Sequence, residues 1–117
     1  MKLETVVRLV QHALTDDLRL SEYRGNANPM AGHCYVASEA LYHLLGGKEA
    51  HLTPAHVMHE GRQHWFLKSP DGVIDATVSQ FKSEPKYARA RHSGFMTKLP
   101  SKRAKVVINR VLGNVTT

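Results

Sequence analysis

The sequence predicts a small α+β fold in which a helix that carries the only cysteine packs on an antiparallel sheet. Apolar residues recur at helical spacing over residues 3–14, 34–45 and 104–112. Between the second and third of these segments, residues 62–68 and 73–78 resemble two strands joined by a turn. Strands joined by a short turn pair antiparallel. We therefore expect a single domain over residues 1–117.

The outer helices are predicted by apolar stripes. The first stripe consists of Leu3, Val6, Val7, Val10 and Leu14. The last consists of Ala104, Val107, Ile108, Val111 and Leu112. Ser101 is a candidate cap for the last helix, and Gly113 is a candidate stop.

The central helix is predicted to begin at Cys34 and to stop at Gly46-Gly47. Residues 21–32 before it are rich in turn formers and predict a loop. The apolar face of the helix consists of Ala37, Ala40, Leu41, Leu44 and Leu45. Small alanine side chains would let strands pack closely, which favours a central position for this helix.

Composition favours a reducing compartment. The chain has one cysteine, so it cannot form an internal disulfide. Its apolar runs are short, and its N-terminus lacks the apolar core of a signal peptide. We expect a cytoplasmic protein that does not interact with a membrane.

Charge is distributed unevenly along the chain. Residues 1–75 hold seven Lys/Arg and nine Asp/Glu, whereas residues 76–117 hold nine Lys/Arg and only Glu84. A basic face attracts acidic proteins or nucleic acid, although it can equally be a solvated surface. We take Lys102, Arg103 and Lys105 as the candidate partner surface.

Cys34 is a candidate nucleophile because of its position. A thiolate, not a thiol, is the reactive form of cysteine. The first turn of a helix offers unpaired N–H groups and the positive end of the helix dipole, and both favour the anion. The same N–H groups can receive the oxyanion of an attacked carbonyl.

His64 and Asp75 are candidates for the base and for the residue that orients it. A four-residue loop from Lys68 to Asp71 would place His64 directly opposite Asp75. A pairing shifted by two residues keeps them on one face as diagonal neighbours, whereas a slip by one separates them. On a shared face, Asp75 can hold one ring nitrogen while the other meets Cys34.

Each of these residues has a structural alternative. A single intracellular cysteine is often a small buried hydrophobe, a strand histidine is often structural, and Asp75 could cap a turn. Trp65 alternates to the strand face opposite His64, which predicts a core residue. The catalytic hypothesis depends on the three residues together.

A metal site is the second alternative. Its candidate ligands are His33, Cys34, His51, His56, His59 and His64. Their spacings match no helical pair, and alternation puts His56 and His59 on opposite strand faces. We expect no metal and no cofactor.

The motifs around these residues resemble the papain-like and transglutaminase-like cysteine hydrolases. They are Gly32-His33-Cys34 at a helix start, Gln63-His64-Trp65-Phe66 on a strand and residues 71–81, Asp-Gly-Val-Ile-Asp-Ala-Thr-Val-Ser-Gln-Phe. The resemblance is closest to small bacterial and phage proteins, and it covers roughly residues 28–81. It implies a nucleophile helix packed on an antiparallel sheet that bears the base, with Cys34, His64 and Asp75 as the triad.

The resemblance also implies a chemistry. Such enzymes hydrolyse an amide, isopeptide or other acyl bond, as a peptidase, deconjugase or deamidase. A side-chain amide before the cysteine often donates to the oxyanion, and Asn28 and Asn26 precede Cys34 here. A short chain favours a narrow protein or peptide substrate, one that is acidic if the basic third of the chain steers it. A phage-borne member would act in the host cytoplasm.

The contrasting hypothesis is a binding module without catalysis. Its basic C-terminal third would bind nucleic acid or an acidic protein, with Tyr87 and Phe95 as aromatic contacts for single strands. The sequence shows no recognised aromatic-basic motif there. The acyl substrate, the choice between hydrolysis and transfer, and the oligomeric state stay open at this stage.

Overall fold

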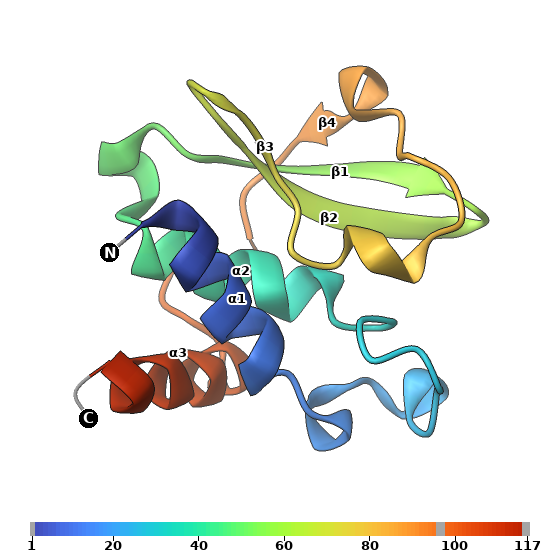
Figure 1. The fold of residues 1–117 in the computed structure, drawn as a ribbon. Coiled ribbons are helices and arrows are strands. Elements are labelled where there is room, and N and C mark those ends of the chain that lie inside the picture. Colours follow the sequence, from blue (N-terminus) through green and yellow to red (C-terminus); the bar gives the residue numbers. More distant parts are fainter. Residues whose placement is uncertain (1, 96–97, 116–117) are drawn as a thin grey trace.

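The computed structural model describes residues 2–95 and 98–115, and these form an α+β fold (Figure 1). The helices in these ranges are α1 (Leu3–Ala13), α2 (Cys34–Leu44) and α3 (Lys102–Val115). The strands are β1 (Thr53–His59), β2 (Arg62–Ser69), β3 (Gly72–Ile74) and β4 (Arg91–His92). The sheet is antiparallel with the order β3-β2-β1-β4, which confirms the expected fold class.

The main core lies between the helices and one face of the sheet (Figure 1). α1 contributes Val6 and Val10, which are one helical turn apart and buried. α3 contributes Val107 and Val111, and Leu67 comes from β2. α2 has buried residues on several sides because it lies between the other helices and the sheet.

A second, smaller core covers the opposite face of the sheet. Ala55, Val57 and Phe66 are buried there against Tyr87 and Ala90. Strand alternation explains the division, because Phe66 and Leu67 are consecutive in β2 and therefore face opposite sides. The segment after β3 thus covers the second face of the sheet, and it brings Asp75 and Phe81 close to His64.

Glu39 joins α2 to the start of α3. Its side chain is fully buried, and its two carboxylate oxygens accept hydrogen bonds from the Ser101 N–H at 2.8 Å and the Ser101 hydroxyl at 2.7 Å. The Ser101 hydroxyl oxygen also accepts from the Ala104 N–H at 3.3 Å, which confirms the predicted N-cap. The predicted stop at Gly113 is wrong, because α3 continues to Val115.

The predicted hairpin is present but tighter and shorter than expected. Ser69 pairs with Gly72, so the loop has two residues rather than four. β3 ends at Ile74, and the predicted strand over 73–78 instead becomes a turn followed by a 3₁₀ segment, Val78–Gln80. β3 consequently pairs only with Leu67–Ser69, so the first half of β2 has β1 on one side only.

Within the described ranges, no helix combines the length and apolar character required to cross a membrane.

Candidate active site

Cys34 begins α2 and reaches the open edge of β2. Its side chain is partly buried, and its Sγ lies 3.9 Å from the backbone oxygen of Gln63. Gln63 directly precedes His64, so the sulfur lies beside the candidate base. No described residue accepts a hydrogen bond from the Cys34 N–H, as expected for the first turn of a helix.

His64 is buried, and its two ring nitrogens have different surroundings. Nε2 lies 2.6 Å from Oδ2 of Asp75, and both side chains are almost completely buried. Nδ1 is buried without a hydrogen-bond partner among the described residues. A buried ring nitrogen without a partner is costly unless it serves a purpose, and Cys34 is the neighbour that interacts with this ring.

The pairing register explains how Asp75 meets His64. Extending the β2–β3 ladder by one position puts Asp75 opposite Phe66, because Leu67 pairs with Ile74. His64 is two residues before Phe66 and shares its face. The two side chains are therefore diagonal neighbours, which is the two-residue shift considered above.

Two further groups hold the Asp75 carboxylate. The Tyr87 hydroxyl donates to Oδ2 at 2.9 Å, and the Thr77 N–H donates to Oδ1 at 3.3 Å. Sequence reasoning considered Tyr87 only as an aromatic contact for nucleic acid, because it lies twelve residues beyond Asp75 in a 3₁₀ segment without a periodic pattern. The signal available was only that a tyrosine follows the hairpin.

The network changes the charge of His64. Burial, the largest single influence, lowers the pKa of His64, but the hydrogen bond with Asp75 and the electrostatic interactions with Asp75 and Cys34 outweigh it and raise that pKa to about 9. His64 is therefore an imidazolium at neutral pH. Burial and the nearby charge of Asp75 raise the pKa of the Tyr87 phenol, so this hydroxyl stays a donor.

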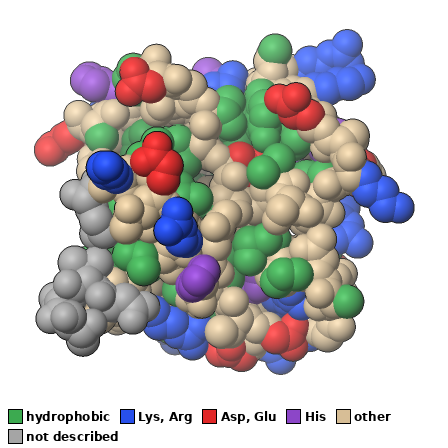
Figure 2. Space-filling model, in the orientation of Figure 1, with side chains coloured by type: hydrophobic (Ala, Val, Ile, Leu, Met, Phe, Trp, Pro, Cys, Tyr) green, Lys and Arg blue, Asp and Glu red, His purple; other side chains and the backbone are tan. Residues whose placement is uncertain are grey.

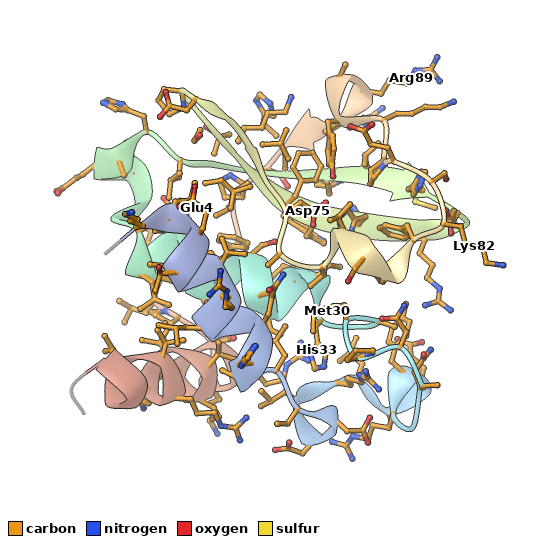
Figure 3. The ribbon with its side chains drawn as sticks, in the orientation of Figure 1. Glu4, Met30, His33, Asp75, Lys82 and Arg89 are labelled. Carbon is orange, nitrogen blue, oxygen red and sulfur yellow. The ribbon has the colours of Figure 1, made fainter. Side chains whose placement is uncertain are left out.

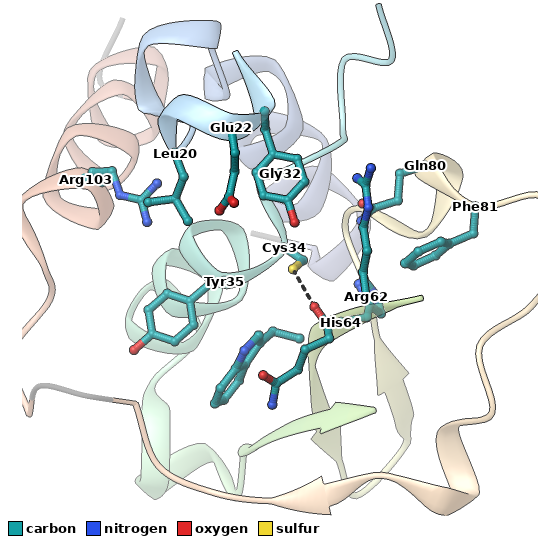
Figure 4. A pocket seen from close by; sticks show the side chains of 13 residues that line it. Leu20, Glu22, Gly32, Cys34, Tyr35, Arg62, His64, Gln80, Phe81 and Arg103 are labelled. Carbon is teal, nitrogen blue, oxygen red and sulfur yellow. Dashed lines mark hydrogen bonds between the residues drawn. The ribbon is translucent and has the colours of Figure 1, made fainter. Parts of the chain in front are cut away.

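A cavity of about 400 Å³ opens onto the Cys34 sulfur (Figure 4). Its apolar walls come from Leu20, Tyr23, Tyr35, Trp65 and Phe81. Its charged walls come from Glu22, Arg62 and Arg103, and His64 and Gln80 also line it. Volume and lining are typical of a site for a small molecule or a short segment of a larger one.

The prediction that Trp65 is a core residue is wrong, because its side chain belongs to neither core cluster. It is half-buried, lines the cavity and meets Tyr35 edge to face, with ring centroids 5.0 Å apart. Tyr35 follows Cys34 directly, so the aromatic pair forms the wall next to the nucleophile.

Arg19 organises the loop that leads to Cys34. Its buried guanidinium donates to Asp16 Oδ1 at 2.9 Å and to the backbone oxygens of Asn26 and Asn28, at 2.9 and 2.6 Å. Its Nε donates to Nε2 of His33 at 3.2 Å, which requires a neutral His33 with its proton on Nδ1. Burial, followed by the charges of Arg19 and Arg103, lowers the pKa of His33 to about 4.

His33 and Gly32 end this loop immediately before the nucleophile. Figure 3 shows His33 near Met30, next to the start of α2. Gly32 has a φ of +78°, and a Cβ at this position would lie 2.6 Å from the Cβ of Tyr23. Only glycine satisfies both conditions, so the two residues that precede Cys34 fix its position.

Asn28 does not line the cavity at Cys34. It lines an adjacent cavity of about 220 Å³ with Asn26, and its Oδ1 accepts a hydrogen bond from the Met30 N–H at 3.0 Å. Its backbone oxygen is held by Arg19. Asn28 therefore shapes the loop in this structure.

The predicted basic surface is divided by the fold. Lys102 and Lys105 are exposed on α3, but Arg103 is half-buried, donates to the backbone oxygen of Leu18 and lines the Cys34 cavity. Lys82 and Arg89 point away from the body of the molecule (Figure 3). On the face shown in Figure 2, acidic and basic side chains are interspersed.

The candidate metal ligands do not converge. Within residues 2–95 and 98–115, no three His, Cys, Asp or Glu side chains are close enough together to hold a metal ion. His59 contacts Ser83 and Glu60, and His56 contacts Gln63.

Comparison with known proteins identifies the family of the chain. The family model described as YunG protein matches residues 1–114, almost the entire chain. No curated protein and no solved structure matches the chain.

Proposed function

The chain belongs to the YunG family, and we propose that it is a cysteine-dependent hydrolase of an amide, isopeptide or other acyl bond. Cys34 is the nucleophile, His64 transfers the proton and Asp75 orients His64. The observation that carries the proposal is the buried Nδ1 of His64, which has no described hydrogen-bond partner and lies on a ring that interacts with Cys34. Its other nitrogen is held by Asp75 at 2.6 Å.

The charge of His64 supports the first step. An imidazolium next to the sulfur stabilises the thiolate form of Cys34. The thiolate attacks the substrate carbonyl carbon, forming a C–S bond, while the carbonyl π electrons move to the oxygen. The N–H of Cys34 has no described acceptor, so it is free to donate to that oxyanion. Because Asn28 lines the neighbouring cavity, we assign the oxyanion to the Cys34 N–H alone.

His64 then completes the cycle. Its Nδ1–H protonates the leaving amine as the C–N bond breaks, which leaves a thioester on Cys34 and a neutral imidazole. The neutral Nδ1 accepts a proton from water while the water oxygen attacks the thioester. The C–S bond breaks, the acid leaves, and the thiolate–imidazolium pair is restored.

The surroundings of the site support a compact substrate. A cavity of about 400 Å³ fits one acyl group with its flanking side chains rather than a long folded segment. The nucleophile helix on an antiparallel sheet that carries the base supports the resemblance to papain-like and transglutaminase-like enzymes. A reducing cytoplasm would keep the single cysteine active.

Alkylation with iodoacetamide tests the proposal, since Cys34 is the only cysteine and every thiol adduct reports on it. We expect native Cys34 to be alkylated at pH 7 much faster than the urea-unfolded chain. His64→Ala and the bulkier His64→Gln should each slow the native rate at least tenfold. His12→Ala, which changes an exposed histidine on α1, is the matched control and should leave the rate unchanged.

The acyl intermediate gives a second test. Incubation with p-nitrophenyl acetate should give one equivalent of nitrophenolate in a burst and an acetyl adduct on Cys34, detected by intact mass. Equal alkylation of native and unfolded chains, together with no burst, would show that Cys34 is not an activated nucleophile.

A further inference from the structure

We propose that Arg62 binds a carboxylate that flanks the reacting carbonyl, so that the substrate is an acidic acyl or peptide group. This inference rests on the proposed function, because it assigns the substrate class of the same site. It identifies Arg62 as a specificity-determining residue.

Arg62 lines the same cavity as Cys34 and His64. It is two residues before His64 on β2, so both side chains leave the same strand face, roughly 7 Å apart along the chain. The backbone oxygen that the Cys34 thiol contacts belongs to Gln63, between them. Figure 4 shows Cys34 between Tyr35 and Arg62 within the cavity.

The charge of Arg62 is not neutralised by the protein. Its side chain is exposed, and among the described residues no carboxylate lies within ion-pair distance of it. Glu60, the acidic residue that shares the adjacent cavity, accepts hydrogen bonds instead from the Ser83 hydroxyl and the N–H groups of Lys82 and Ser83. The guanidinium is therefore available to a ligand.

The Tyr23 ring holds this charge in place. The Arg62 guanidinium carbon lies 4.9 Å from the centroid of that ring, a cation–π arrangement. Stacking leaves the N–H groups in the guanidinium plane free, and these N–H groups bind a carboxylate in bidentate fashion. Tyr23 itself contacts the backbone at Gly32, so the arginine is coupled to the loop before the nucleophile.

The rest of the lining gives the substrate a direction. Glu22 and Arg103 both lie on the side of Gly32 away from Arg62 (Figure 4). Arg103 already donates to the Leu18 oxygen, and Glu22 disfavours a second negative charge there. The carboxylate therefore binds on the Arg62 side, and the apolar part of the substrate lies against Tyr35 and Trp65.

A binding experiment tests the inference without requiring catalysis. Trp65 is the only tryptophan and lines the cavity, so its fluorescence reports on occupancy. In a Cys34→Ser protein, the α-amide of N-acetylglutamate should change this fluorescence and saturate, and the α-amide of N-acetylglutamine, which has no carboxylate, should bind at least fivefold more weakly. Arg62→Gln should remove that preference, Arg62→Lys should keep part of it, and Lys105→Gln, an equal charge change at an exposed site on α3, should leave it intact.

An alkylation experiment tests the same residue at the reacting atom. Iodoacetate and iodoacetamide both form a C–S bond with the thiolate and release iodide, and they differ only in the carboxylate. Arg62→Gln should slow iodoacetate about fivefold to tenfold while changing iodoacetamide by less than twofold. In the native protein, the rate of alkylation by iodoacetate relative to that by iodoacetamide should fall as salt is added, because salt screens the charge of Arg62.

The outcomes separate the two proposals. Rapid alkylation of Cys34 with no charge preference, or a preference that survives Arg62→Gln, overturns the inference and leaves the hydrolase proposal standing. Slow alkylation of Cys34 without a charge preference, combined with Arg62-dependent binding of the glutamate ligand, overturns the hydrolase proposal and keeps the proposed carboxylate site. An equal response to both amino-acid ligands, or no response to either, overturns the inference.

Discussion

At the scale of single residues, the charge of His64 is set by two opposing influences. Burial disfavours the imidazolium, whereas the carboxylate of Asp75 and the sulfur of Cys34 favour it. The hydrogen bond with the buried Asp75 carboxylate, 2.6 Å away, is the largest favourable interaction. The proposed triad therefore needs the carboxylate for its charge state as well as for its geometry.

Asp75→Asn tests this balance. We expect the pKa of His64 to fall from about 9 to or below the ordinary value near 6.5, because burial remains while the opposite charge is removed. An NMR titration of the His64 ring protons measures the change. Tyr87→Phe retains the carboxylate and should leave the pKa of His64 well above 6.5. A His64 pKa that stays near 9 in Asp75→Asn would contradict the account.

The three residues of the proposed triad could be located from the sequence, but the residues that hold them in position could not. Cys34, His64 and Asp75 each occupy a position that periodicity or strand alternation can locate. Tyr87 and Arg19 act through contacts between segments that no local pattern relates, since each donates across a loop. Nothing in the sequence distinguishes Arg62 from the other basic residues, because only the fold shows that it lines the cavity at Cys34.

At the scale of elements, the segment that leads into α2 positions Cys34 without an α-helix or a strand. Its backbone is held by the Arg19 guanidinium, and its last residues are a glycine with positive φ and a buried neutral histidine. Turn-forming residues predicted a loop here, and that prediction is confirmed. Composition could not predict that one buried arginine, Arg19, holds the loop through hydrogen bonds to its backbone oxygens.

Gly32→Ala tests how tightly this loop is packed, with Gly25→Ala as its matched control. Both glycines have φ near +80°, but a Cβ at Gly25 meets nothing within 4 Å, whereas one at Gly32 would lie 2.6 Å from Tyr23. Gly25→Ala should cost about 1–2 kcal/mol of unfolding free energy from backbone strain alone. Gly32→Ala should cost about 1–3 kcal/mol more, from overpacking, and should also slow Cys34 alkylation. Urea unfolding gives the stabilities, and equal losses in the two variants would contradict the tight packing.

The hairpin illustrates what strand pattern can and cannot predict. Alternation predicted that His64 and Phe66 share a face, but an even loop length was a condition of that argument, which the two-residue loop meets. Alternation could not predict where β3 ends, because Asp75 and Thr77 fit a strand pattern equally well. The chain leaves the sheet at Asp75, whose carboxylate binds His64 and Tyr87. This early departure opens the edge of β2 to Cys34.

At the scale of the whole molecule, two buried histidines make stability depend on pH in opposite directions. His64 has a pKa raised to about 9, so it binds its proton more tightly when folded. Its contribution is fully present below about 6.5 and is lost as pH rises through 9. His33 has a pKa lowered to about 4, so the unfolded chain binds its proton more tightly, and stability is lost as pH falls from 6.5 toward 4.

Stability should therefore be highest near neutral pH and fall on both sides. A shift from 6.5 to about 9 corresponds to roughly 3 kcal/mol, to order of magnitude, of stability lost on the alkaline side. Urea unfolding at pH 5, 6.5 and 9.5 measures the free energy of unfolding on the acid limb and on the alkaline limb of its pH dependence. His64→Gln should flatten the alkaline limb while keeping the acid one, and His33→Gln should do the reverse. An alkaline limb that is equally steep with and without His64 would mean that no buried imidazolium exists, and the activated thiolate proposed for Cys34 would lose its counter-ion.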